Sequence, residues 1–382
     1  MLLLGALVLL VAFSRPLRDF VEYWTVAHVF VSGGNPYSLA EVFRREVALG
    51  WKEPVALMCV NPPWTLPLIA PLGMLSSYTF AWLLWSGALL TAILISSELL
   101  LDLYAPEIRL TEISDSRLMR RLFACSFYPA LLVIRFAQVA PLILLGLALF
   151  LWLEKRGHFF FAGTALFLCA IKPQLVYLLF LAVILDAVQR KSWKTLAGIA
   201  WPIVLLTQIA SVPDRLLIRH YLALCGGPYM QLYPSALGAI LRAPFGDRNT
   251  FALQFLPSFF GIIWFAWYWS RQRSTWNWIN SAPALITASV LTASWGWLFD
   301  QVLLVVPVVA LFAECIRRFG VLPRWAVAAY TVLNVSLIIG SMVKSISIPY
   351  AIAPITFSIS LWLMGRYPSS RSLEPEPCHV HR

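Results

Sequence analysis

Charged residues are scarce in this 382-residue chain. They make up 12% of it, whereas a soluble globular domain carries about 25%. With so few charges, the chain lacks the solvating groups that a fully water-facing surface of this size needs. Hydrophobic residues make up 60% of the chain, and the mean hydropathy is +0.76. The composition therefore excludes an ordinary soluble domain and predicts that lipid is the solvent for much of the protein.

Acidic residues are the rarer charge type. The chain has 18 Asp and Glu against 29 Lys and Arg, which gives a formal net charge of +11. In a soluble protein this excess would favour nucleic acid as a partner. Here the basic residues stand mostly in short runs between apolar segments, which is the pattern of cytoplasmic loops. We therefore expect no nucleic-acid partner.

Cysteine and histidine show none of the spacings that metal sites need. The six cysteines include no CxxC pair, so neither a zinc site nor a redox pair is predicted. Cys59 and Cys225 fall in segments that we expect outside the membrane, where two unpaired thiols are predicted and a disulfide is the alternative. His379 and His381 lie near the C-terminus without companion ligands. We expect no metal and no other cofactor.

What the sequence has instead is a series of about twelve apolar segments, some long enough for the roughly 20 residues of a membrane-spanning helix and some shorter. They predict an all-α polytopic membrane protein with about 10–12 transmembrane or partly spanning helices and two long outer loops. The predicted segments are Met1–Phe13, Tyr78–Leu101, Leu122–Ile134, Ala140–Leu153, Phe159–Ile171, Leu175–Val188, Leu196–Ser211, Phe251–Trp269, Trp278–Ala293, Phe299–Cys315, Val321–Met342 and Ile346–Met364.

Orientation follows from the basic clusters, because Lys and Arg concentrate in cytoplasmic loops. Counting segments places every cluster, and both termini, on one side, which we assign to the cytoplasm. The outer loops are then residues 14–77 and 212–250. We expect one integral membrane domain over residues 1–364 and a polar, disordered cytoplasmic tail over 365–382. The clusters are Arg117, Arg120 and Arg121; Lys155 and Arg156; Arg190, Lys191 and Lys194; Arg271 and Arg273; Arg317 and Arg318.

Four consecutive segments between residues 122 and 188 are too short to cross a membrane. About 13 residues of helix span about 20 Å of a hydrocarbon core that is about 30 Å thick. Two helical hairpins would therefore turn below the outer surface, where irregular polar backbone is tolerated only against protein or a watery cavity. The sequence predicts an outward-opening cavity with four polar side chains near its floor: Arg135, Gln138, Lys172 and Gln174.

Three charged residues are candidates for chemistry. Asp19 lies just beyond the first apolar segment and four residues before Tyr23, so a helix would put both on one face. A carboxylate at the rim of a cavity can act as a general base toward a hydroxyl; the alternative is a solvated acid paired with Arg15 or Arg18. Lys172 is costly in an apolar region and needs a partner or a task.

An anionic phosphate would be a suitable partner for Lys172, and the guanidinium of Arg135 could also bind that phosphate. The alternatives for Lys172 are snorkelling to the surface and pairing with Asp300. Asp300 itself begins a predicted helix on the outer side, where stabilising the helix dipole is the alternative role. The remaining acidic residues of the apolar segments lie near cytoplasmic ends and are predicted to be structural; they are Glu98, Asp102, Asp186 and Glu314.

The stretch from Asn61 to Leu72 contains several prolines, which exclude a regular spanning helix. A short segment lying in the membrane interface is one interpretation, and a shaped loop is the one that we favour for these residues.

The order of these motifs resembles the bacterial membrane glycosyltransferases of family 87, which have the GT-C fold and include polyprenyl-phosphate-mannose-dependent mannosyltransferases. The resemblance runs from about Asp19 to the last helices. The chain departs from the family pattern at Asn61, where an aromatic residue often precedes the paired prolines. The motifs are Asp19, Tyr23, Gly34-Asn35-Pro36-Tyr37, Pro62-Pro63, Pro71-Leu72, Gln138, Lys172-Pro173-Gln174 and Asp300.

The resemblance implies an enzyme of the bacterial inner membrane that takes a hexose from a polyprenyl-phosphate sugar. The acceptor, a glycolipid or glycan, would present its hydroxyl from the outer aqueous side. Asp19 matches the position of the general base of an inverting transfer. By position we expect seven residues to bind the substrates: Lys172, Arg135, Gln138, Gln174, Asp300, Tyr23 and Tyr37.

Two other classes of protein stay open at this point. One is a transporter or flippase for a lipid-linked or amphipathic solute, although matching halves with paired broken helices, which would favour it, are not visible. The other is a non-catalytic component of an envelope assembly that uses its outer loops for docking.

Overall fold

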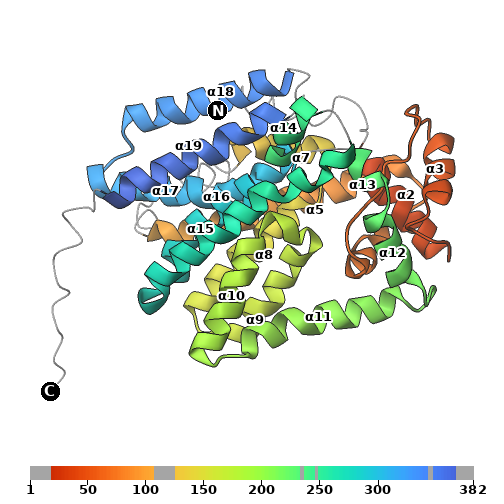
Figure 1. Cartoon of the computed structure of the whole chain (residues 1–382), viewed down its shortest axis with the longest axis horizontal. Helices are drawn as coiled ribbons and strands as arrows, with labels where there is room; N and C mark the ends of the chain where they lie inside the picture. Colours follow the sequence, from red (N-terminus) through yellow and green to blue (C-terminus); the bar gives the residue numbers. More distant parts are fainter. Residues whose placement is uncertain (1–18, 107–124, 233–235, 246–247, 343–346, 367–382) are drawn as a thin grey trace.

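The computed structural model describes the chain except for residues 1–18, 107–124, 233–235, 246–247, 343–346 and 367–382. The predicted first segment and the predicted tail therefore lie wholly or almost wholly outside the described residues. The described residues form helices and the segments that connect them, and no β-strand occurs among them. The helices form one elongated assembly (Figure 1). This architecture confirms the prediction of an all-α polytopic membrane protein.

Four helices of the described chain are long and apolar enough to cross a membrane. The first is α5 (Tyr78–Tyr104), which begins where the hydroxyl of Ser77 accepts a hydrogen bond from the backbone N–H of Phe80. In two of the other three, a 3₁₀ helix continues directly into an α-helix. The remaining three are η6 (Arg248–Phe255) with α15 (Leu256–Gln272), η8 (Leu298–Leu304) with α17 (Val305–Phe319), and α18 (Arg324–Met342).

The predicted short segments are short helices in the structure. None of them reaches the roughly 20 residues that a membrane-spanning helix needs. Their connections contain the predicted irregular backbone: Ala137 is left-handed with φ 51°, and Pro173 opens a 3₁₀ turn. The elements are α7 (Tyr128–Phe136), α8 (Ala140–Lys155), α9 (Phe159–Leu166), η3 (Phe167–Ile171), η4 (Pro173–Leu175) and α10 (Tyr177–Arg190).

Helix α11 (Lys194–Ala210) follows α10 after a tight turn but packs mainly against α9. Glycine makes this possible, because a Cβ at Gly163 or Gly198 would collide with the backbone of the other helix. In Figure 1, α11 runs across the ends of the neighbouring helices toward α12. The rest of the bundle consists of η7 (Arg273–Thr275), α16 (Trp278–Thr292) and α19 (Ser347–Arg366).

The first predicted outer loop is an ordered helical unit over its described residues. It consists of α2 (Phe20–Val31), α3 (Leu39–Ala48), η1 (Pro63–Thr65) and α4 (Leu66–Gly73). The interpretation of residues 61–72 as a shaped loop was therefore wrong. Pro67 falls in the first turn of α4, where its missing N–H leaves no hydrogen bond unmade. Helices α2 and α4 pack closely where Gly73 meets the backbone of Ala27.

The second predicted outer loop packs against the first. The hydroxyl of Tyr229 accepts a hydrogen bond from the backbone N–H of Met58 at 2.8 Å, and the rings of Tyr37 and Tyr221 lie 5.3 Å apart. Cys59 and Cys225 are both free thiols, as predicted. The helices here are α12 (Leu217–Gly226), α13 (Tyr229–Leu232), α14 (Ala236–Arg242) and η5 (Ala243–Phe245).

Two buried hydrophobic clusters organise these parts. The larger one joins the long helices to α8 and α10, and the smaller one joins the two predicted outer segments to the N-terminal half of α5. Ala137, Val139 and Ile171 belong to the smaller cluster, although they come from the tips of the two hairpins. The hairpin tips are therefore held against the first outer segment, and this places Asp19 next to Gln138.

Candidate active site

The side-chain amide of Gln138 is the centre of a buried polar group. Its Nε2 donates hydrogen bonds to Asp19 Oδ2 and to Glu22 Oε1, both at 3.2 Å. Its Oε1 accepts from the hydroxyl of Tyr23 at 2.7 Å and from Lys172 Nζ at 3.2 Å. An amide has two N–H donors and two lone pairs on oxygen, so all four positions are used. We call Gln138, its four partners and Asp300 the Gln138 cluster; the partners are Asp19, Glu22, Tyr23 and Lys172.

Local sequence fixes the position of Gln138. Helix α7 ends at Phe136, and the left-handed Ala137 turns the chain so that the N–H of Gln138 bonds to the carbonyl of Val133 at 3.1 Å. The indole N–H of Trp85 donates to the carbonyl of Ala137 at 2.8 Å. The tip of this hairpin is thus tied to its own helix and to α5, which limits the movement of the amide.

Lys172 and Asp300 form an ion pair, with Nζ 2.9 Å from Oδ1. Their side chains are 11% and 2% exposed, so neither charge is solvated by bulk water, and the pairing compensates for part of that cost. The other carboxylate oxygen of Asp300 accepts the backbone N–H of Trp297 at 3.0 Å and stabilises the start of η8. Both alternatives that we left open, pairing for Lys172 and helix-start stabilisation for Asp300, occur in the structure.

Asp19 stands at the start of α2 and is partly buried. One turn later, Tyr23 is fully buried. The two residues contact the same amide, so they share a face as predicted. The predicted alternative partners, Arg15 and Arg18, lie outside the described residues. The function of Asp19 as a base stays a prediction.

Glu22 is a member of the cluster that was not among the predicted site residues. It lies in α2, in the first outer segment, and is 9% exposed. Burial and, to a smaller extent, the neighbouring charge of Asp19 together raise the pKa of Glu22 to about 8, against the lowering effect of Lys172. At neutral pH this side chain is therefore mostly a neutral acid. Its spacing of three residues from Asp19 is the sequence feature that could have indicated it.

Three predicted site residues do not bond to the Gln138 cluster. Arg135 lies in the last turn of α7, partly buried, and has no ion-pair partner within the described part of the chain. Gln174 lies in η4, also partly buried. Tyr37 is buried in the same hydrophobic cluster as Tyr23, but its hydroxyl donates to the carbonyl of Asn61 at 3.0 Å. The substrate roles of all three stay predictions.

The Gln138 cluster places an acid and a cation on opposite sides of one amide group. Asp19 offers a carboxylate that can accept a proton, and Lys172 offers a fixed positive charge that can stabilise an anionic leaving group. These residues come from α2, the first hairpin, the second hairpin and η8, and they meet where both predicted outer segments and the hairpin tips are joined. The arrangement suits a transfer reaction at one end of a helical membrane bundle.

The fold and this cluster define a multi-pass membrane protein with a polar site built at the tips of truncated hairpins. Residues 59–294 match the model of Glycosyltransferase family 87. This match covers more than half of the chain, so the protein belongs to glycosyltransferase family 87 and is a membrane glycosyltransferase. Gln138 and Lys172 lie within the matched region, whereas Asp19 and Asp300 lie outside it. The search of curated proteins and the search of solved structures returned no match.

Proposed function

We propose that the protein transfers a hexose from a polyprenyl-phosphate sugar to an acceptor hydroxyl on the outer face of the bacterial inner membrane. The acceptor is a glycolipid or a glycan, mannose is one candidate sugar, and the scaffold is of the GT-C type. The observation that carries this proposal is the contact of Asp19 and Lys172 with the same amide of Gln138. A base for the acceptor and a cation for the donor phosphate then stand within one site.

The reaction is a single inverting displacement. The acceptor oxygen attacks the anomeric carbon, and the bond from that carbon to the phosphate oxygen breaks. The proton of the acceptor hydroxyl passes to the carboxylate of Asp19, and the electron pair of the broken bond leaves with the polyprenyl phosphate. No enzymic nucleophile takes part, because one displacement by the acceptor is enough.

Lys172 stabilises the departing phosphate in this proposal. Its ammonium group is already desolvated beside Asp300, so the charge is fixed in position before the donor arrives and needs little reorganisation. Arg135 lies at the same hairpin tip as Gln138 and would add a guanidinium to the donor phosphate. Gln174 and Tyr37 would line the sugar-binding part of the site, and Tyr23 holds the Gln138 amide in place.

Burial of Glu22 has a specific consequence for the base. If Glu22 were ionised, its charge beside Asp19 would disfavour a second carboxylate. As a neutral acid, Glu22 adds no negative charge beside Asp19. The Gln138 amide, which donates to both, holds the two carboxyl groups in defined positions.

Purified protein in lipid nanodiscs tests the donor. It is incubated with a panel of polyprenyl-phosphate hexoses, and slow release of free sugar and polyprenyl phosphate is measured by chromatography. We expect hydrolysis of at least one polyprenyl-phosphate hexose and none of the matching nucleotide sugars. Hydrolysis of a nucleotide sugar alone would overturn the proposed donor class. A parallel assay uses proteoliposomes of the same lipid composition. Movement of an intact lipid-linked sugar across their membrane, without cleavage, would favour the flippase instead.

A further inference from the structure

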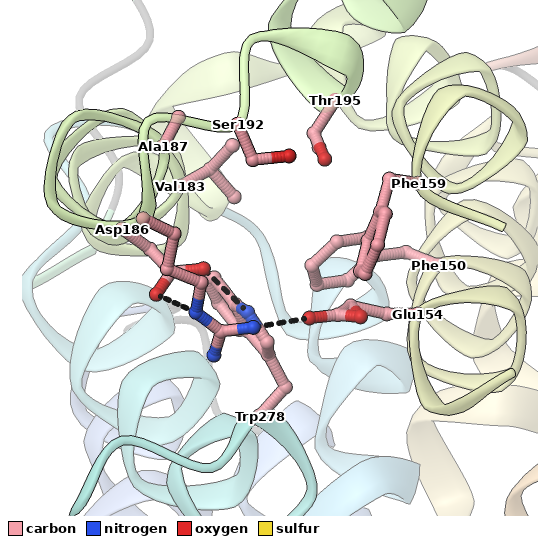
Figure 2. A pocket seen from close by; sticks show the side chains of 10 residues that line it. Phe150, Glu154, Phe159, Val183, Asp186, Ala187, Ser192, Thr195 and Trp278 are labelled. Carbon is pink, nitrogen blue, oxygen red and sulfur yellow. Dashed lines mark hydrogen bonds and ion pairs between the residues drawn. The ribbon is translucent and has the colours of Figure 1, made fainter. Parts of the chain in front are cut away.

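A second polar site lies at the opposite end of α10 from the Gln138 cluster. It is a cavity of about 220 Å³ at the ends of α8, α9, α10, α11 and α16. These are the helix ends that the basic residues place on the cytoplasmic side. Figure 2 shows Glu154 and Asp186 on opposite sides of the cavity, with Trp278 closing one side and Ser192 and Thr195 at another.

The charges of the lining do not balance. Arg190 bonds through Nε to Asp186 Oδ1 at 2.8 Å and through a terminal nitrogen to Glu154 Oε1 at 3.3 Å. The indole N–H of Trp278 donates to the other oxygen of Asp186 at 3.1 Å. With both carboxylates ionised, one guanidinium faces two negative charges, so the lining carries one uncompensated negative charge. We call Glu154, Asp186, Arg190 and Trp278 the Arg190 cluster.

The nearest exposed basic side chains do not neutralise this charge within the cavity. Arg156 is directed to Asp102 at 3.3 Å and lies over the ring of Trp152 at 3.6 Å. Lys191 and Lys194 are exposed and are not part of the lining. They lie beside the cavity, at the turn between α10 and α11. The interior of the site is therefore negative and its rim is positive.

Aromatic rings form the remaining wall. Phe150, Phe159 and Trp278 all line the cavity, and the rings of Phe150 and Trp278 meet edge to face at 4.9 Å. Aromatic faces attract cations, and an aromatic wall beside carboxylates is the chemistry that binds organic ammonium groups. An anionic group would face two carboxylates and the negative faces of these rings, against the single cation of the lining, Arg190, which already bonds to both carboxylates. The lining thus selects an ammonium group.

An apolar groove of about 270 Å³ adjoins this cavity, and Val183 lines both. The groove runs between α10 and α11, two helices that diverge in Figure 1 because α11 packs on α9. On α11 the lining residues recur three or four positions apart and form one stripe: Leu196, Ile199, Ala200, Ile203 and Val204. A stripe of this kind along a membrane helix contacts hydrocarbon chains.

We propose that this face binds a phospholipid with a primary ammonium headgroup, of the phosphatidylethanolamine type, from the cytoplasmic leaflet. The ammonium group enters the cavity beside Glu154, which Arg190 contacts through one carboxylate oxygen, and against the rings of Phe150 and Phe159. The phosphate lies at the rim near Lys191 and Lys194, with the hydroxyls of Ser192 and Thr195 as further donors. One acyl chain follows the groove between α10 and α11. This site is separate from the proposed reaction and does not depend on it.

Lipid titration followed by native mass spectrometry tests the proposal on the full-length protein in detergent. The probes are phosphatidylethanolamine and phosphatidylglycerol with identical acyl chains. We expect the ethanolamine lipid to bind about tenfold more tightly, which corresponds to one desolvated cation–aromatic contact with charge pairing. Equal binding, or tighter binding of the glycerol lipid, would overturn the assignment; the second result would identify an anionic-lipid site instead.

Two pairs of variants separate the headgroup from the chain. Ala200→Trp fills the groove and should lower binding of the ethanolamine lipid about tenfold, whereas Ala197→Trp, on the same helix but outside the groove, should not. Glu154→Gln should remove the preference for the ethanolamine lipid, and Glu314→Gln, an ion-paired acid elsewhere in the bundle, should keep it. If Ala200→Trp unfolds, Val204→Trp replaces it. Equal binding by both members of either pair would contradict the site.

Discussion

The Gln138 cluster and the Arg190 cluster have the same composition in outline but differ in the burial of their cations. Each pairs one basic side chain with acids: Lys172 bonds to Asp300 and to the Gln138 amide, whereas Arg190 bonds to Asp186 and Glu154. Lys172 is 11% exposed, whereas Arg190 is 40% exposed. A half-exposed arginine beside two acids keeps much of its hydration, so it can stabilise helix ends with only a small desolvation cost. A buried lysine has lost its hydration, so its position requires either a strong partner or a function.

The two clusters also differ in how they are assembled. Arg190 meets Asp186 one turn away on the same helix and Glu154 on α8. The Gln138 cluster draws its members from segments more than 100 residues apart, such as Asp19 and Gln138. The comparison teaches that a buried cluster gathered from distant segments is the better candidate for catalysis, and that a cluster on adjacent helix ends is a candidate for structure or lipid binding. Four experiments can break or sharpen this distinction.

The largest effect is expected for Asp19→Asn. Removal of a general base lowers the rate about 100- to 10,000-fold, because the amide cannot accept the proton of the acceptor hydroxyl. Sugar transfer is measured with the donor found active in the hydrolysis panel. Asp214→Asn, which removes another acid of the outer segments, bonded to His220 at 2.8 Å, is the matched control and should retain activity. Unchanged transfer in Asp19→Asn would eliminate the assignment of the base.

Lys172→Met should cost both activity and stability. The substitution leaves the buried carboxylate of Asp300 without its cation, and breaking a buried pair of this kind costs about 3–5 kcal/mol in the free energy of unfolding. The double variant Lys172→Met/Asp300→Asn should recover most of the stability but none of the donor hydrolysis. Denaturant unfolding in detergent and the hydrolysis assay measure the two properties. Recovery of activity in the double variant would show that Lys172 serves only as a structural partner.

Glu22 should make stability depend on pH. Folding raises the pKa of Glu22 from 4.5 to about 8, so between these values the folded protein holds a proton that the unfolded chain releases. This contribution to stability is fully present below pH 4.5 and is lost as the pH rises through 8. We expect a decrease of about 3 kcal/mol in the free energy of unfolding between pH 5 and 8.

The variant Glu22→Gln keeps an uncharged side chain at every pH and should remove the Glu22 part of the slope. A smaller slope should remain, because burial raises the pKa of Glu46 to about 7. Glu41→Gln, in the neighbouring α3 helix, is the control and should leave the profile unchanged. The measurement is denaturant unfolding at pH 5, 6.5 and 8. A slope in Glu22→Gln as steep as that of the unchanged protein would contradict the prediction for Glu22.

The smallest effect is expected for Arg190→Met. Because this guanidinium is half exposed, we expect a loss of about 1 kcal/mol in the free energy of unfolding and a change in sugar transfer of less than about twofold. The assays are those used for Lys172→Met, which makes the two cations directly comparable. A loss of transfer as large as that of Lys172→Met would remove the distinction between the clusters.

Much of the fold could be predicted from apolar segments and basic loops. The limits of α8 and α10 differ from the predicted segments by only a few residues, because hydrocarbon length and charged ends mark them directly. The turns at Gln138 and Lys172 were predictable because the flanking segments are too short to span. Residues 61–72 were misjudged because Pro67 is compatible with the first turn of a helix, and periodicity cannot be recognised over eight residues.

The site was less predictable than the fold. Lys172 was identified because a charge in an apolar segment is costly. Glu22 was missed because an acid in an outer segment has no such cost until the hairpin tips bury it. Arg135 was expected to share the donor phosphate with Lys172. It lies partly buried in the last turn of α7 and does not bond to the Gln138 cluster, so this role stays a prediction.

The membrane setting of this protein, the places where its truncated hairpins turn and the charges at those turns could all be read from the sequence, because they follow from the local balance between hydrocarbon and water. Only the tertiary structure decided that one glutamine joins Asp19, Glu22, Tyr23 and Lys172, and that α11 separates from α10 to open an apolar groove. Such contacts depend on how distant helices pack, and packing is set by the combined shape of many side chains rather than by any one segment.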